Sequence, residues 1–177
     1  VMIGGGYRNG HRINFTDPAA YRHHRGLRPE DLAWIRETCG LPVVVKGVLR
    51  PDDARRCVEA GAAAVWVFNH GVRQLDRVVS TATALPQVVA TVGAEAEVYV
   101  DGGVRSGIDV LTALGLGARA VLVGRPALHA LASDGAAGVA GLLDTLTEEL
   151  LEALELAGCG SLQGARTVVA PPDLCSP

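Results

Sequence analysis

Residues 97–126 read EVYVDGGVRSGIDVLTALGLGARAVLVGRP, and this stretch contains the pattern that decides the fold. A β-branched apolar run from Glu97 to Asp101 precedes a glycine-rich turn, a helical pattern from Ser106 to Leu116 and a second apolar run from Ala118 to Gly124. Short runs that are apolar almost throughout are typical of parallel strands covered on both faces. The stretch therefore predicts a strand, a helix and a parallel strand joined by a right-handed crossover.

The same unit recurs upstream. PVVVK at 42–46 and AAVWVF at 63–68 are predicted strands, each followed by a predicted helix. The helices expected outside the opening stretch cover residues 27–39, 51–60, 73–92 and 138–157. Lys46, His70, Asp101 and Gly124 then follow successive strands at the spacing of β/α units.

The expected fold class is α/β. Four parallel β/α units with a terminal helix make half of a TIM (β/α)8 barrel, which typically needs about 250 residues. A flat, doubly wound sheet is the alternative. The candidate functional residues favour the barrel, because each follows a different strand at its carboxyl end. A half barrel cannot close, so its edge strands need a further segment, a second copy or another chain to cover them.

Composition indicates a globular protein with a small-molecule ligand. The 177 residues are 49% hydrophobic and 20% charged, with a net charge of −3 and no Lys/Arg run that would favour nucleic acid or an anionic membrane. No apolar run approaches the roughly 20 residues of a membrane span. The four cysteines lack CxxC spacing, which predicts a reduced, cytoplasmic chain without a zinc site. The chain opens with Val1, which suggests a fragment or a start inside a longer reading frame.

A phosphate site is predicted where two adjacent units meet. The Asp101–Gly107 loop joins a strand to a helix, and its glycines let backbone N–H groups approach an anion. Gly124 and Arg125 follow the next strand, at the position where barrels commonly hold phosphate. The expected contacts are Asp101, Gly102, Gly103, Val104, Arg105, Gly124 and Arg125. The plainer interpretation is that the glycines only form tight turns and the arginines are solvated.

Three residues are candidates for chemistry. Lys46 follows an apolar strand, so its ammonium could neutralise an anionic ligand, although a strand-end lysine can also reach solvent. His70 could act as a general base near neutral pH. Arg73 has the planar fork that captures a carboxylate, close enough in sequence to place that carboxylate beside His70. Taken alone, His70 and Arg73 would more often be loop and surface residues.

The remaining charged and histidine residues receive no predicted function. The leader histidines are expected at the surface, and His129 on a helix surface or in packing. The pair Arg55–Arg56 and the acidic residues of the last helix are expected on solvated helix faces. The leader histidines are His11, His23 and His24, and the acidic residues of the last helix are Glu148, Glu149, Glu152 and Glu155.

Four motifs together resemble the FMN-dependent α-hydroxy-acid dehydrogenase family, which includes glycolate oxidase, lactate oxidase, lactate monooxygenase and flavocytochrome b2. They are LPVVVKG (41–47), NHGVRQLD (69–76), DGGVRSGIDV (101–110) and LGARAVLVGRP (116–126). The resemblance implies that residues 27–162 are the C-terminal half of that family's barrel. Residues 1–26 are then an irregular leader or linker, and residues 163–177 a C-terminal tail.

The resemblance also implies roles. Lys46 would lie by the flavin and stabilise the reduced ring, His70 would be the base that also contacts substrate, and Arg73 would hold the substrate carboxylate. Residues 101–105 with Gly124 and Arg125 would hold FMN through its ribityl and phosphate groups. The electron acceptor stays open among oxygen, a quinone and a cytochrome, and tetramers are common in the family, so a homo-oligomer is possible.

The sequence departs from the family at three positions. Phe68 stands where a small serine is usual close to the flavin, and Val72 and Arg77 replace residues that are often small. The family's first four β/α units, with the carboxylate that orients the histidine, have no counterpart in these residues.

The leading hypothesis is FMN-dependent oxidation of a small 2-hydroxy acid, lactate-like or glycolate-like, to its 2-keto acid. The alternative is a truncated, non-catalytic half-barrel remnant that binds FMN or phosphate weakly or not at all. Relatives of IMP dehydrogenase and of type 2 isopentenyl diphosphate isomerase share glycine-rich phosphate loops, but the pair of His70 and Arg73 argues against them.

Overall fold

A single five-stranded parallel sheet runs through the computed structural model, which describes Met2–Ile3 and residues 28–169. The strands are β1 (Met2–Ile3), β2 (Val44–Val48), β3 (Ala64–Val67), β4 (Glu97–Asp101) and β5 (Ala120–Leu122). Their order in the sheet is their order in the sequence. A doubly wound sheet reverses its strand order at a switch point. The unbroken order is that of a barrel wall, so the predicted half of a (β/α)8 barrel is confirmed.

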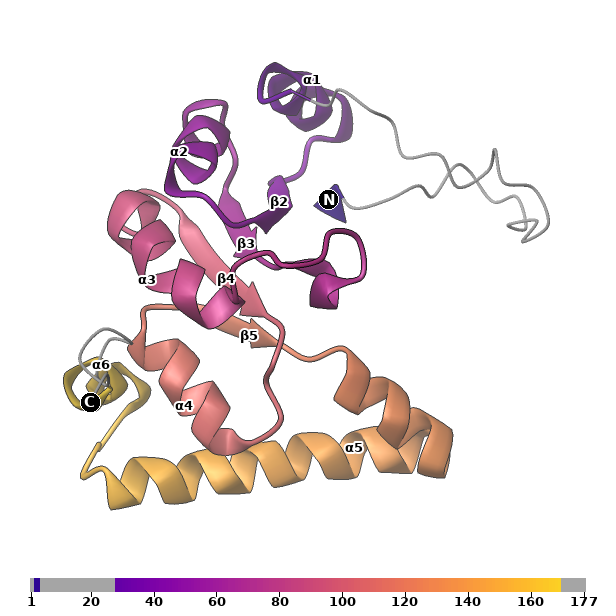
Figure 1. Cartoon of the computed structure of the whole chain (residues 1–177), viewed down its shortest axis with the longest axis vertical. Helices are drawn as coiled ribbons and strands as arrows, with labels where there is room; N and C mark the ends of the chain where they lie inside the picture. The colour runs from indigo at the N-terminus through magenta and orange to yellow at the C-terminus, as the bar shows by residue number, and fades with distance from the viewer. Residues whose placement is uncertain (1, 4–27, 170–177) are drawn as a thin grey trace.

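The helices lie mainly on one face of this sheet. They are α1 (Glu30–Cys39), α2 (Pro51–Glu59), α3 (Thr81–Val92), α4 (Gly107–Gly115), α5 (Arg125–Leu156) and α6 (Ala165–Val168), with 3-10 turns η2 (His70–Val72) and η3 (Leu162–Gly164). Figure 1 shows α1 to α4 stacked along one side of the strands, with the second part of α5 running beside α4. None of the helices in the described part of the chain combines the length and apolarity that crossing a membrane requires.

Alternation along the strands separates a packed face from an inner face. Val65, Val67, Val98 and Val100 are buried in one core with residues of α2, α3 and α4. Successive strand side chains point to opposite faces. Residues such as Lys46, which alternate with this set, therefore lie on the face that forms the inside of a barrel.

Several predicted element boundaries agree with the structure. The strand at Glu97–Asp101 is confirmed, and α2 begins at Pro51 as predicted. Gly40 ends α1 in the left-handed conformation, with φ of 65°. The break of α5 at Asp134 and Gly135 separates a short first helix from the long helix predicted at 138–157.

Other boundaries were predicted wrongly. The strand predicted at 42–46 continues to Val48 through an irregularity in its pairing, where Gly47 has φ of 97°. The helix predicted from residue 73 begins only at Thr81, because the Ser80 side chain caps it by accepting from the Thr83 N–H. Met2–Ile3 were assigned to an irregular leader but form β1, which pairs with β2. The rest of the predicted leader and residues 170–177 of the tail lie outside the described residues, including His11, His23 and His24.

Two charged residues predicted on solvated faces make long-range contacts instead. The Arg55 guanidinium lies 2.7 Å from the Glu95 carboxylate and donates to the Thr91 carbonyl, which ties α2 to the end of α3. Glu149 accepts a 2.7 Å hydrogen bond from the Gly107 backbone N–H and so connects α5 to the start of α4. Both pairings join residues far apart in sequence, which a helix-face pattern does not reveal.

The contact of α4 with α5 requires a glycine at position 107. A Cβ atom there would stand 2.2 Å from the Leu150 backbone nitrogen and 2.4 Å from the Glu149 carbonyl carbon. Gly107 itself is buried. Because neither obstacle is the end of a flexible side chain, the helices would have to move apart to admit a methyl group.

We expect Gly107→Ala to lower the free energy of unfolding by about 1–3 kcal/mol, the usual cost of overpacking. Gly141→Ala is the matched control: a Cβ there meets no atom within 4 Å, and alanine favours a helix interior by about 1 kcal/mol. Urea denaturation of both variants checks this. Equal stability of the two variants would contradict the tight α4–α5 contact.

Candidate active site

A cavity of about 470 Å³ opens at the carboxyl ends of β3, β4 and β5. Three consecutive strand-to-helix loops line it. Its walls are Phe68, His70, Gly71 and Arg73 after β3, Asp101 to Arg105 after β4, and Val123 to Pro126 with Leu128 and His129 after β5. The structure therefore brings most of the predicted site residues together. Lys46 is the exception, since it is not among the described residues that line the cavity.

The loop after β3 holds His70 in a constrained position. The Asn69 side chain accepts from the Gly71 N–H at 3.0 Å and donates to the Val79 carbonyl at 3.4 Å. His70 has φ of 57°, and a Cβ on Gly47 would stand 2.9 Å from its ring carbon Cε1. The imidazole is thus packed against the backbone of β2. Its ring centroid lies 4.8 Å from that of Phe68.

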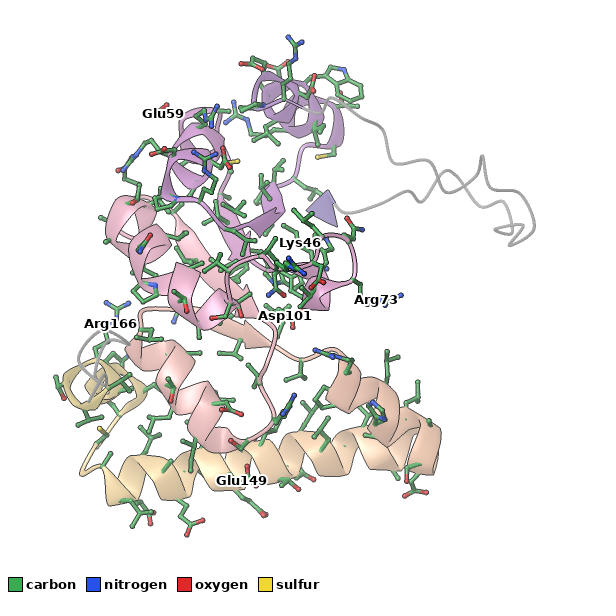
Figure 2. All side chains as sticks on the ribbon, viewed as in Figure 1. Lys46, Glu59, Arg73, Asp101, Glu149 and Arg166 are labelled. Carbon is green, nitrogen blue, oxygen red and sulfur yellow. The ribbon has the colours of Figure 1, made fainter. Side chains whose placement is uncertain are left out.

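Arg73 lies at the rim of the cavity. Its side chain is exposed, and in Figure 2 it extends outward from the loop, away from Lys46 and Asp101. An exposed guanidinium at the rim is free of packing that would prevent it from turning toward an incoming carboxylate. The structure thus places Arg73 near His70 in the same loop without fixing it against the histidine.

Lys46 lies on the inner face of β2, beside the irregularity between Lys46 and Val48. Its ammonium nitrogen stands 4.3 Å from the centroid of Phe68 and 4.8 Å from that of Trp66. Two aromatic faces within about 6 Å attract a cation through their quadrupoles. The indole Nε1 of Trp66 is buried without a hydrogen-bond partner among the described residues.

Asp101 ends β4 at the centre of the cavity wall. Burial raises the pKa of its carboxyl group, because desolvation disfavours the charged form. The Gly102 N–H and the charges of Lys46, Arg125 and His70 act in the opposite direction. The carboxyl therefore stands near basic side chains contributed by three other strand–loop units, as expected for a site that spans several units of a barrel.

Carboxylates already fill the amino end of α4. The Asp109 side chain accepts from the Arg105 and Ser106 backbone N–H groups at 2.9 and 3.1 Å, and Glu149 accepts from Gly107. The Ser106 hydroxyl in turn accepts from the Asp109 N–H, completing a capping box. Three successive backbone donors of the glycine-rich loop are therefore engaged within the protein. An added anion here would meet two negative charges.

The amino end of α5 has no such cap. Gly124 precedes the helix without a side-chain hydrogen bond, and Pro126 stands in its first turn. The Arg125 guanidinium reaches toward the loop after β3, since a Cβ on Gly71 would stand 3.6 Å from one of its nitrogens. A helix amino end with an adjacent arginine attracts an anion. Of the amino ends of α4 and α5, that of α5 is the one without a side-chain cap.

Two positioning contacts were not predicted from the sequence. The buried Thr81 hydroxyl donates to the Gly102 carbonyl at 3.1 Å and anchors the glycine turn to the start of α3. Its partner is 21 residues away in sequence, so no local pattern indicates it. The Ser106–Asp109 capping box has a recognisable local spacing and could have been found. His129, expected only as surface or packing, is exposed and lines the cavity.

The sequence profile of the family described as FMN-dependent dehydrogenase matches residues 7–170. The chain belongs to this family. It is 50% identical over 138 residues to an L-lactate oxidase of Nostoc sp., covering 78% of this chain and 38% of that protein. It is 53% identical over 137 residues to a 4-hydroxymandelate oxidase of Amycolatopsis orientalis, covering 77% of this chain and 38% of that protein.

Solved structures of family members share the fold. A lactate oxidase from Pediococcus acidilactici superposes with a TM-score of 0.79 at 38% identity, over 82% of this chain and 40% of that one. A mandelate oxidase mutant with a monooxide FMN adduct gives 0.76 at 51% identity, over 79% and 45% of the two chains. The chain thus spans less than half the length of each of these family members.

Gly124 provides a test that separates ligand binding from folding. Its φ of −109° suits any residue, and a Cβ there would meet no protein atom within 4 Å although the residue lines the cavity. We expect Gly124→Ala to keep the thermal midpoint and to weaken FMN binding about tenfold or more, because the methyl group occupies ligand space. Calorimetry measures the thermal midpoint, and flavin fluorescence titration measures the affinity for FMN. Unchanged affinity would show that the ligand lies elsewhere.

Asp101 should make stability depend on pH. The pKa of its carboxyl is raised above the ordinary value of 3.8, so the native state binds the carboxyl proton more tightly than the unfolded chain does. The protonated carboxyl therefore favours folding at low pH. This contribution to stability is lost as the pH rises through the raised pKa. Asp101→Asn should therefore raise the melting temperature slightly at pH 7 and lose that gain below the ordinary pKa. A gain of the same size at pH 3 and pH 7 would contradict the assignment.

Proposed function

We propose that this chain contributes the active site of an FMN-dependent enzyme that oxidises a small 2-hydroxy acid, lactate-like or glycolate-like, to the 2-keto acid. One observation carries the proposal: a single cavity brings His70 and Arg73 together with the uncapped amino end of α5. A base, a carboxylate-binding cation and an anion site are the three functions that such a reaction needs. The names of the relatives, which are oxidases of lactate and 4-hydroxymandelate, support the substrate class.

The residues present fit an FMN molecule. Its phosphate would be held by Arg125 and the backbone at Gly124, and its ribityl chain by Asp101 and the Gly102–Val104 turn. Gly103 and Gly124 leave open space where side chains would stand, which suits a ligand in close contact with the backbone. Arg105 would add positive charge in the cavity, and Lys46 lies outside its lining. When bound, the flavin supplies an acceptor for the two electrons that leave the substrate.

The remaining steps belong to the chain's own side chains. Arg73 would turn inward from the rim and pair with the substrate carboxylate through its two-pronged guanidinium. That pairing would place the substrate's hydroxylated carbon next to His70. The imidazole would take a proton from the substrate, and its contacts with Phe68 and the Gly47 backbone would keep it oriented.

Further observations bear on the setting of the enzyme. Residues 27–162 would be the catalytic unit, flanked by the leader and tail predicted from the sequence. The three described cysteines, Cys39, Cys57 and Cys159, are free thiols, which suits a reducing cytoplasm. The sequence predicts no nucleic-acid partner. A homo-oligomer would cover the open sheet edges, and the electron acceptor is oxygen, a quinone or a cytochrome.

His70→Asn tests the base. FMN-loaded chain mixed anaerobically with lactate, glycolate or mandelate should lose its visible absorption, and we expect the variant to bleach about 10²- to 10⁴-fold more slowly while retaining flavin. His129→Asn is the matched control, an exposed histidine on the same cavity wall, and should bleach normally. Stopped-flow absorbance measures all three proteins.

Two results would decide against the proposal. Equal bleaching by the His70 and His129 variants would remove His70 from the chemistry. Tight FMN binding without bleaching by any of the three acids would instead favour the non-catalytic half barrel.

A further inference from the structure

Phe68 lines the cavity that the chemistry would use and contacts the only lysine of the 177 residues. The Phe68 ring lines that cavity, whereas Lys46 does not. The Lys46 ammonium lies 4.3 Å from the centre of the Phe68 ring, and the His70 ring centre lies 4.8 Å from it. Phe68 thus contacts both Lys46 and His70, the residue that the proposed function makes the base.

The ammonium has an aromatic environment on two sides. Trp66 is 7% exposed and presents its ring 4.8 Å from the same nitrogen, while the Trp66 and Phe68 rings are tilted at 43° with centroids 6.5 Å apart. No carboxylate lies within salt-bridge distance of Lys46 among the described residues. The two rings are therefore the closest stabilising contacts that the structure gives this cation. Such contacts are stronger when the cation is partly removed from water.

Lys46 is nevertheless close enough to act on the cavity. Burial raises the pKa of the Asp101 carboxyl, which lines the cavity wall, and the charge of Lys46 acts against that rise. The lysine side chain is flexible, with a compact charge on a four-carbon stem. Displacement of the Phe68 ring would remove one of the two aromatic contacts of the ammonium and would free it to turn toward an anionic ligand.

We propose that Phe68 is a gate residue: it holds the Lys46 ammonium against Trp66 and away from the cavity, so that an anionic flavin gains Lys46 only by displacing the ring. This inference rests on the proposed function for the identity of the ligand. Flavin binding must break the ammonium–ring contacts before Lys46 can pair with it. Phe68 therefore lowers cofactor affinity in this chain, and its removal strengthens binding.

A double-mutant cycle with FMN as the ligand tests the gate. Phe68→Ala should tighten FMN binding by roughly 2- to 30-fold, the range that the loss of a cation–π contact allows. Lys46→Met should change the affinity less than twofold in the wild-type background and should cancel most of the gain in the Phe68→Ala background. Leu128→Ala, which removes an exposed apolar side chain from the same cavity, is the control and should give no gain.

Two outcomes of the cycle would overturn the gate. Weaker FMN binding by Phe68→Ala would show that the ring is a flavin contact. An equal effect of Lys46→Met in both backgrounds would show that Lys46 already reaches the ligand. If none of the proteins binds FMN, the proposed function fails, and a resonance measurement on the ligand-free chain decides on Phe68.

Nuclear magnetic resonance gives a second readout that needs no flavin. Because Lys46 is the only lysine, its ε-methylene protons give one identifiable signal, which Lys46→Met removes. Ring currents should shift this signal upfield in the wild-type chain, and Phe68→Ala should reduce the shift. FMN added to the wild-type chain should move the signal in the same downfield direction. An unshifted lysine signal in the ligand-free chain would overturn the gate whatever the protein's activity.

Discussion

The hydrogen bond from the Gly107 N–H to the Glu149 carboxylate is the contact on which the site depends. It holds α5 against α4 at a position where no side chain larger than hydrogen fits. It fixes the start of α4 beside the glycine turn after β4, whereas the amino end of α5, which lies before the break at Asp134 and Gly135, is positioned by β5. The cavity exists because those two loops are held side by side, each following a neighbouring strand of one parallel sheet.

The amino ends of α4 and α5 differ in the charges placed beside them, and the Glu149 contact contributes to this difference. Glu149 and Asp109 neutralise the positive end of α4, whereas α5 begins without a side-chain cap and with Arg125 in its first turn. Protein carboxylates thus occupy the amino end of α4, whereas the amino end of α5 is where we propose that the ligand phosphate binds. The aromatic contacts of Lys46 keep its positive charge close to the cavity, although Lys46 is not among the residues that line it.

Patterns local in sequence predicted much of this arrangement. The apolar runs at 97–101 and 118–124 and the glycine-rich turns gave the parallel units, and the motifs around His70 and Asp101 placed their loops at one end of the sheet. The roles of Glu149, Thr81 and Phe68 could not be predicted, because each depends on a contact formed only after folding. The β2 irregularity after Lys46 was missed for a similar reason, since strand periodicity does not mark where pairing shifts.

Comparison of FMN with riboflavin, which lacks the phosphate, is the most direct test of the central claim that the amino end of α5 and Arg125 hold a flavin phosphate. The purified 177-residue chain is mixed with each compound and dialysed, and its visible absorption is recorded. The account predicts that FMN absorbance is retained and riboflavin absorbance is lost. Retention of both compounds to the same extent, or of neither, would contradict it.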